Sequence, residues 1–192
     1  SGKNIKIFTD NIVFSWPISH DGESEIVNTL IDMATYQLHF TLQNLFIRGA
    51  ITSGINFINK DFVLGPAHLQ SYQLEENEAI VPRIILSNNI LQRLKQFSIY
   101  YHKNDPTFKN WIIKDQDGYY FINYLYTIIE YMNAIKDYRI GFELLRKHKE
   151  ITISNLNKFK NDDKVWSKYF WVANYNNYFS NYILRNEYDT EN

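Results

Sequence analysis

The sequence contains no cysteine, so disulfide bonds, thiolate metal sites and a cysteine nucleophile are all excluded. This absence fits a reducing cytosol, and we expect a cytoplasmic protein. No apolar run approaches the roughly 20 residues that span a bilayer, so we expect no membrane partner. The formal net charge is only −1, which provides no basic field for recruiting nucleic acid, and we expect no nucleic-acid partner.

The residues that are present have the composition of a folded domain. The 192 residues are 45% hydrophobic and 17% aromatic, which is typical of one domain with a sizeable core. Apolar periodicity and turn residues predict the order of elements in the first half. The predicted elements are a hairpin at 4–18, a helix at 24–46, strands at 48–57 and 60–65, a helix at 66–78, a strand at 80–87 and a helix at 88–97.

This order predicts an α+β fold, in which helices cover an antiparallel or mixed sheet. Pro82 predicts that its strand either lies at a sheet edge or starts near this residue. Residues 111–125 predict a hairpin with Asp117-Gly118 in its turn, and helices are expected at 142–158 and 164–181. The aromatic residues of the last helix are expected to face the core. "DQDG" lacks the third acid and the distal Glu of a calcium loop.

Asp10 is the most unusual residue of the first hairpin, "IKIFTDNIVFS", because apolar residues surround it. Three interpretations are open. "TDN" is good turn chemistry, since Asp and Asn tolerate tight-turn dihedral angles. Asp10 could also be a structural acid with a basic partner, or a metal ligand. A buried, unpaired carboxylate costs several kcal/mol, so the acid needs one of these explanations.

Common catalytic motifs are missing. The five histidines form no HxxxH or HExxH pair, and GxSxG, GxGxxG and GxxxxGK[ST] do not occur. What the chain does contain is an ordered series: the hairpin with its Asp, a long helix, "RGAITSG", "GPA", "YQLE" and "AIVPRI". This series resembles the class III nucleotidyl cyclases. With "DGYYFINYL", "RKHKEI" and "KYFWVANYNN", it looks most like the bacterial pyrimidine cyclases of the Pycsar anti-phage systems, from about residue 4 to 178.

The resemblance implies a catalytic role for Asp10 and Arg48. Class III cyclases hold two metal ions, Mg²⁺ or Mn²⁺, between two Asp residues, and Asp10 matches the second of these. The strand with the first Asp would lie upstream of Ser1, so the chain would be a fragment or would have lost this strand and a helix. Arg48 occupies the position of a triphosphate-binding Arg, whose rigid fork suits phosphate oxygens. Alternatively, Arg48 is a surface residue paired with an acid.

Four further positions concern which nucleotide base the expected substrate would carry. Lys6 matches a base-contacting position of the purine cyclases, although it could equally be a solvated strand Lys. Leu69 and Gln73 stand where purine cyclases carry Asn and Arg, and Phe62 stands where they place a base-reading Asp. These departures weaken an adenylate or guanylate assignment. They fit either the pyrimidine subgroup or a domain that has lost activity.

The resemblance therefore implies a homodimeric cyclase that converts UTP or CTP to the 3′,5′-cyclic monophosphate and pyrophosphate in phage defence, with composite sites at the dimer interface. Residues 1–141 would form the catalytic domain, and residues 142–192 a helical extension packed on it. The alternative is a catalytically inactive cyclase-like domain that binds a nucleotide or a partner. An RNA-binding module has little support, because no basic stripe is interleaved with the tyrosines.

Overall fold

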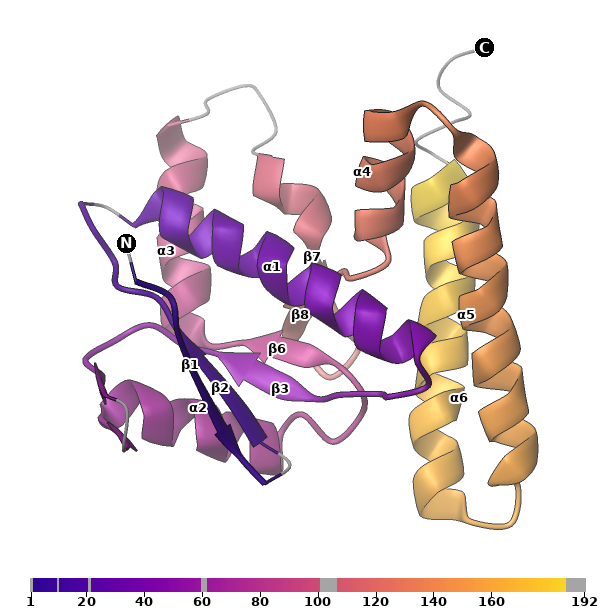
Figure 1. The fold of residues 1–192 in the computed structure, drawn as a ribbon, viewed down its shortest axis with the longest axis horizontal. Helices are drawn as coiled ribbons and strands as arrows, with labels where there is room; N and C mark the ends of the chain where they lie inside the picture. The colour runs from indigo at the N-terminus through magenta and orange to yellow at the C-terminus, as the bar shows by residue number, and fades with distance from the viewer. Residues whose placement is uncertain (1, 10, 21, 60–61, 101–106, 186–192) are drawn as a thin grey trace.

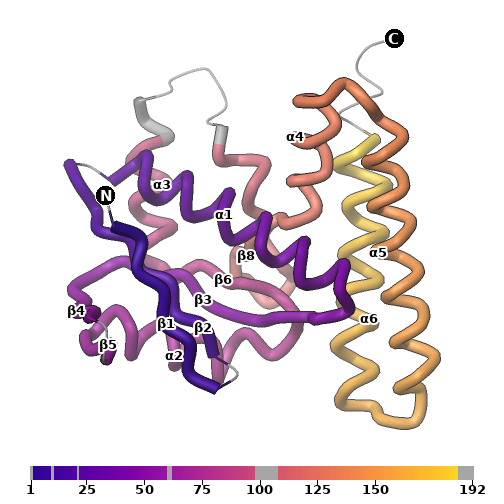
Figure 2. The backbone as a smooth tube through the Cα atoms, viewed as in Figure 1, coloured from indigo at the N-terminus to yellow at the C-terminus, as the bar shows by residue number. Residues whose placement is uncertain are grey.

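The structure is a computed structural model that describes residues 2–9, 11–20, 22–59, 62–100 and 107–185. It confirms a mixed α and β fold, in which helices surround a central four-stranded sheet (Figure 1). The sheet lies in the middle of the molecule, and one long helix crosses in front of it. The last two long helices stand side by side at the right of the view, and the tube drawing shows the same arrangement (Figure 2).

The predicted N-terminal hairpin is confirmed. Strand β1 (Asn4–Phe8) pairs antiparallel with β2 (Asn11–Ser15), and the last pair is Phe8 with Asn11. The chain therefore reverses direction between these two residues. Because side chains alternate along a strand, Ile5 and Ile7 share one face with their cross-strand partners Phe14 and Ile12.

The central sheet has the strand order β3-β6-β8-β7. Strands β3 (Gly49–Ile51) and β6 (Ile84–Leu86) are parallel, whereas β8 (Tyr120–Ile122) pairs antiparallel with β6 and with β7 (Ile112–Lys114). The sheet is thus mixed. All three residues of β6 are buried, as expected for an interior strand. Of the two positions that Pro82 predicted, the strand start is confirmed, because β6 begins two residues after Pro82, and the edge position is wrong, because β6 is internal.

The strand predicted at 48–57 is much shorter than expected. After β3 the chain turns toward the start of the next helix: Thr52 Oγ1 donates to the Ala67 carbonyl at 2.9 Å, and the Ala67 amide donates to the Ile55 carbonyl at 3.3 Å. A Cβ on Gly65 would lie 2.7 Å from the Ile55 carbonyl oxygen, so this close approach requires glycine. Strands β4 (Phe57–Ile58) and β5 (Val63–Leu64) then form a separate two-stranded sheet.

The three helices of the first half lie close to their predicted positions. They are α1 (Glu23–Leu42), α2 (Pro66–Asn77) and α3 (Asn88–Tyr100). Helix α1 buries most of its predicted apolar stripe, including Leu30 and Ala34, whereas Leu45 lies beyond the helix and is exposed. It ends four residues earlier than predicted, since Asn44 adopts a left-handed backbone conformation with a φ of 65°.

The second half contains one helix that the sequence analysis did not predict, α4 (Tyr126–Ile135), whose residues Ile128, Ile129 and Met132 are fully buried. Three residues separate it from β8, and no element was predicted for residues 126–141. The other helical segments are the 3₁₀ turn η1 (Thr107–Trp111), α5 (Tyr138–Lys158), α6 (Asp163–Tyr178) and the π turn η2 (Phe179–Leu184).

Helices α5 and α6 pack against each other, and α6 also packs on the sheet. Trp171 and Tyr175 of α6 contact Phe121 of β8 edge-to-face, with ring centroids 5.2 and 5.4 Å away. The predicted core role of the aromatic residues holds for part of α6 only, because Phe170 and Tyr178 are exposed. The predicted division after residue 141 falls inside α5.

Candidate functional site

Arg48 lies immediately before β3, at the point where α2 packs against this strand. Its Nε is 2.6 Å from Oε1 of Glu75 on α2, and both side chains are partly exposed. This is the arrangement of the alternative interpretation, a partly exposed Arg paired with an acid, and the triphosphate-binding role stays a prediction. An ion pair of this kind contributes at most about 1 kcal/mol. Since a guanidinium has five N–H donors, one contact through Nε leaves further donors for an anion.

The backbone on both sides of Arg48 is fixed by hydrogen bonds. The Gly49 amide donates to the Arg83 carbonyl at 3.1 Å. The buried Gln37 amide, on α1, donates to the carbonyls of Ile47 (3.4 Å) and Pro82 (3.3 Å). Gln37 was not predicted, because it sits among the apolar residues of α1 without any motif. The start of β3 therefore has a defined position relative to α1 and β6.

The predicted substrate-binding residues Leu69 and Gln73 are one turn apart on α2 and are both exposed. Phe62 is also exposed, and its ring lies 5.7 Å from that of Phe57 on β4. The structure thus brings Leu69 and Gln73 onto the helix that contacts Arg48. Phe62 lies on the short segment that leads into this helix.

Lys6 and Asp10 belong to the N-terminal hairpin. Lys6 is half-buried on β1, opposite Val13. Among the described residues, no hydrogen bond or ion pair joins Lys6 to Arg48 or to α2. Asp10 lies outside the described residues, between the paired Phe8 and Asn11, so its role stays a prediction.

The hairpin is anchored to α1 at one end. The Phe14 ring stacks on Tyr36 with 5.3 Å between centroids, and Lys3 Nζ donates to Tyr36 Oη at 2.6 Å. Burial alone would lower the pKa of Lys3, but the hydrogen bond to Tyr36 and the charge of Asp32 raise it overall. Nearer the loop, the Ile7 side chain is 70% exposed. The hairpin is therefore fixed at its base and solvated near its turn.

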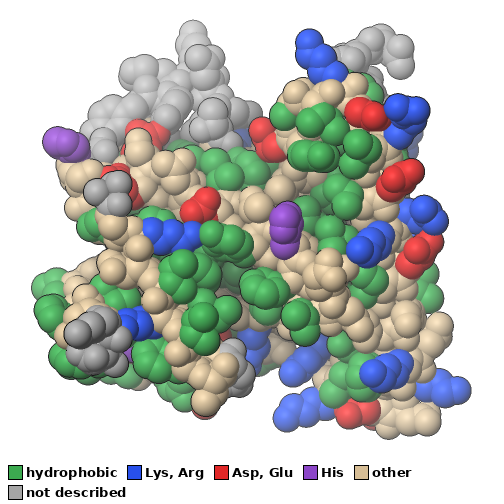
Figure 3. All heavy atoms as spheres, in the orientation of Figure 1, with side chains coloured by type: hydrophobic (Ala, Val, Ile, Leu, Met, Phe, Trp, Pro, Cys, Tyr) green, Lys and Arg blue, Asp and Glu red, His purple; other side chains and the backbone are tan. Residues whose placement is uncertain are grey.

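The exposed apolar side chains of the first 80 residues are concentrated on the hairpin, β4–β5 and α2. Figure 3 shows such side chains over the lower left of the molecule. We call this set the N-terminal apolar surface. It consists of Ile5, Ile7, Phe8, Ile12, Ile55, Phe57, Phe62, Leu64, Leu69 and Tyr72.

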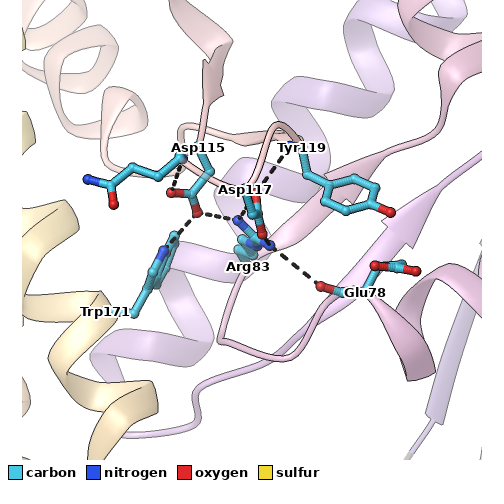
Figure 4. Close-up of polar contacts among 7 residues, drawn as sticks. Glu78, Arg83, Asp115, Asp117, Tyr119 and Trp171 are labelled. Carbon is cyan, nitrogen blue, oxygen red and sulfur yellow. Dashed lines mark hydrogen bonds and ion pairs between the residues drawn. The ribbon is translucent and has the colours of Figure 1, made fainter.

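Arg83 is the most buried charged residue among those described, with 1% of its surface exposed. It forms ion pairs with Asp115 and Asp117 in the β7–β8 turn. Trp171 of α6 donates its indole N–H to Asp115 Oδ2 at 2.8 Å, and Arg83 Nη2 lies 3.5 Å from the Glu78 carbonyl at the end of α2. Figure 4 shows the guanidinium between the turn and Glu78. We call Arg83, Asp115, Asp117 and Trp171 the Arg83 cluster.

The Arg83 cluster explains the acids of "DQDG". Burial alone would raise the pKa of Asp117, but hydrogen bonds from Arg83 and the Tyr119 amide lower it overall. Both carboxylates face a guanidinium, which takes the place that a calcium ion would need. No role was predicted for Arg83 within "AIVPRI". The sequence feature that could have indicated its structural role is an Arg directly before an apolar strand.

A second buried polar network joins α5, α6 and the segment after β8. His148 Nε2 is 2.9 Å from Tyr124 Oη, and the Asn176 amide donates to His148 Nδ1 at 2.8 Å. Burial lowers the pKa of His148 to about 4. The imidazole is therefore neutral at pH 7, which suits a ring nitrogen that accepts a hydrogen bond.

The described residues do not form a metal site by themselves. Within them, no three or more His, Cys, Asp or Glu side chains gather closely enough to hold an ion. The predicted Mg²⁺ or Mn²⁺ thus depends on Asp10 and on a second carboxylate, both outside this part of the chain. None of the helices searched in the described part is both long and apolar enough to cross a membrane.

The comparisons with known proteins add no family. No family model matches the chain, and neither does any curated protein or any solved structure.

Proposed function

We propose that this chain forms most of a class III nucleotidyl cyclase domain whose full protein converts UTP or CTP to the 3′,5′-cyclic monophosphate in anti-phage defence. The observation that carries this proposal is the contact between Arg48 and α2. Two of the ordered motifs, "RGAITSG" and the segment from "GPA" to "YQLE", meet there at one end of β3. A third, "AIVPRI", supports the same backbone through the Arg83 carbonyl.

In the proposed reaction, the ribose 3′-oxygen attacks the α-phosphorus and loses its proton. The bond between the α-phosphorus and the oxygen that bridges to the β-phosphate breaks, and pyrophosphate leaves. Arg48 binds the triphosphate, exchanging the Glu75 carboxylate for phosphate oxygens. Asp10 is the proposed ligand of Mg²⁺ or Mn²⁺, which when bound supplies positive charge to the 3′-oxygen and the departing pyrophosphate.

The base preference rests on the apolar character of two positions. Phe62 stands where purine cyclases place a base-reading Asp and adds bulk, and Leu69 stands where they carry a ribose-orienting Asn, so both changes reduce the polarity of the site. A site without these polar groups gains little binding free energy from the hydrogen-bonding edge of a purine. A pyrimidine, contacted by Lys6 or by a residue outside the described part, is the proposed occupant.

The N-terminal apolar surface supports the proposed homodimer. Exposed apolar side chains of this kind commonly mark protein–protein interfaces. The surface includes Phe62 and Leu69, which are proposed to bind substrate. A second copy that covers it would form a composite site, as the resemblance implies.

The test is a competition assay with the full natural protein, Mn²⁺ and all four ribonucleoside triphosphates, read by the mass of the cyclic product. We expect cyclic UMP or cyclic CMP. Asp10→Asn should lower turnover at least about 10²-fold, the usual scale for losing one key electrostatic group. Cyclic AMP or cyclic GMP as the main product would refute the pyrimidine assignment.

Arg48→Lys tests the phosphate role, because lysine keeps the charge and loses the fork. We expect lower nucleotide affinity and lower turnover. Arg139→Lys is the matched control, since Arg139 forms an exposed ion pair with Asp137 on α5. Equal effects of the two substitutions would remove Arg48 from the site. Nucleotide binding without any product would favour the inactive-domain alternative.

A further inference from the structure

The C-terminal helices contact the proposed site through a continuous series of polar interactions. The series starts at Trp171 on α6, whose indole N–H donates to Asp115 at 2.8 Å. Asp115 pairs with Arg83, which is almost completely buried. Because Asp115 lies in the β7–β8 turn, three separate parts of the chain meet at this one carboxylate.

Two sets of interactions connect Arg83 to Arg48. The Arg83 carbonyl accepts the Gly49 amide at 3.1 Å, and this amide belongs to the peptide bond that follows Arg48. The Arg83 side chain also lies 3.5 Å from the Glu78 carbonyl at the end of α2. One turn earlier on α2, Glu75 pairs with the Arg48 guanidinium. Arg83 therefore supports both the backbone and the side-chain partner of Arg48.

The position of Arg83 is set by few groups. Its Nε is buried and has no hydrogen-bond partner among the described residues, so its orientation depends on the two carboxylates. Trp171 holds one of them from α6. A shift of α6 would move Asp115, and the buried guanidinium cannot exchange a lost carboxylate for water without cost.

We infer that Arg83 is a positioning residue for Arg48, and that Trp171 lets α6 control this positioning. The α5–α6 pair is then a regulatory element: a ligand or partner that moves α6 would change the grip on the triphosphate. The effect on nucleotides rests on the function proposed above, whereas the structural coupling does not.

The experiment uses Trp171→Phe in this chain. Phenylalanine keeps an aromatic ring against Phe121 and Tyr175 but removes the N–H donor. The matched control is Trp166→Phe, also on α6, where the indole stacks on Phe170 with 4.9 Å between centroids. The first measurement is hydrogen exchange of the Gly49 amide and of residues 75–83. We expect faster exchange in Trp171→Phe than in Trp166→Phe, and equal exchange would overturn the coupling.

The second measurement is UTP affinity in the presence of Mn²⁺, in a double-mutant cycle with Arg48→Ala. We expect Trp171→Phe to weaken binding about 3- to 10-fold when Arg48 is present, and to have no further effect in Arg48→Ala. Additive effects would mean that Trp171 acts on stability alone, and would refute the positioning role. If the full natural protein binds no UTP or CTP, the proposed function fails, and hydrogen exchange still decides the coupling.

Discussion

The region around β8, α4, α5 and α6 contains a buried core, whereas the region around β1–β2, β4–β5 and α2 buries few side chains. Both regions expose large apolar residues, such as Phe142 on α5 and Ile7 on β1. In the first, Ile129 and Met132 are fully buried, and buried polar groups such as His148 have partners. The first region therefore contributes more to folding stability than the second.

The two regions also hold their charges differently. Arg83, which joins them, is buried between two carboxylates, whereas Arg48 shares one contact with Glu75 at the surface. Removing one partner of a buried ion pair is costly because the other charge stays desolvated. Exposed pairs contribute little. Arg83 thus has a structural role, whereas Arg48 is able to exchange its ionic partner.

The largest expected effect is that of Arg83→Met, which breaks the connection between the regions. It leaves Asp115 and Asp117 without their guanidinium, and we expect a loss of about 3–5 kcal/mol in the free energy of unfolding, measured with urea. Arg139→Met, on an exposed ion pair, should change the stability by less than about 1 kcal/mol. Similar losses in the two variants would show that the Arg83 cluster contributes no more than a surface pair.

The same Ile→Ala substitution in the two regions compares how much a buried and an exposed side chain contribute to the free energy of unfolding. Ile129 is 0% exposed, so Ile129→Ala should lower the free energy of unfolding by about 2–5 kcal/mol. Ile7 is 70% exposed, and Ile7→Ala should stay within about 0.5 kcal/mol. Both values come from denaturant unfolding of dilute protein. A large loss in Ile7→Ala would mean that the N-terminal apolar surface is already covered in solution.

Acidification should act on the C-terminal region through His148. Its pKa in the folded protein is about 4, below the ordinary value of 6.5, so the unfolded chain takes up the proton first as the pH falls. The folding stability that depends on a neutral His148 is therefore present in full above pH 6.5 and is lost progressively as the pH falls toward 4. Between pH 6.5 and 5 we expect a loss of about 2 kcal/mol in the free energy of unfolding.

The control for this pH dependence is a pair of histidine substitutions. His148→Gln should flatten the slope between pH 6.5 and 5. His39→Gln, at an exposed position on α1, should leave it unchanged. A slope that survives in His148→Gln would assign the dependence to other groups.

Local signals in the sequence were sufficient for the hairpins and most helices. The period of α1, the turn at Asp117-Gly118 and Pro66 at the first position of α2 each depend on neighbouring residues only. Helix α4 was missed: its N-cap residue, Leu125, makes no side-chain capping hydrogen bond, so the sequence there carries no common helix-start signal. The length of β3 was misjudged because the turn of residues 52–56 toward α2 is a tertiary interaction.

Some features of the candidate site were likewise predictable from the sequence, and others depended on tertiary interactions. The sequence by itself determined the α+β class, the hairpin around Asp10 and the candidate residues Lys6, Arg48, Phe62, Leu69 and Gln73. Only the tertiary structure decided that Glu75 pairs with Arg48, that Gln37 and Arg83 support the adjoining backbone, and that Trp171 reaches this support from α6. The physical reason is that these charge pairs and hydrogen bonds join residues 10 to 56 positions apart, at distances that no local pattern encodes.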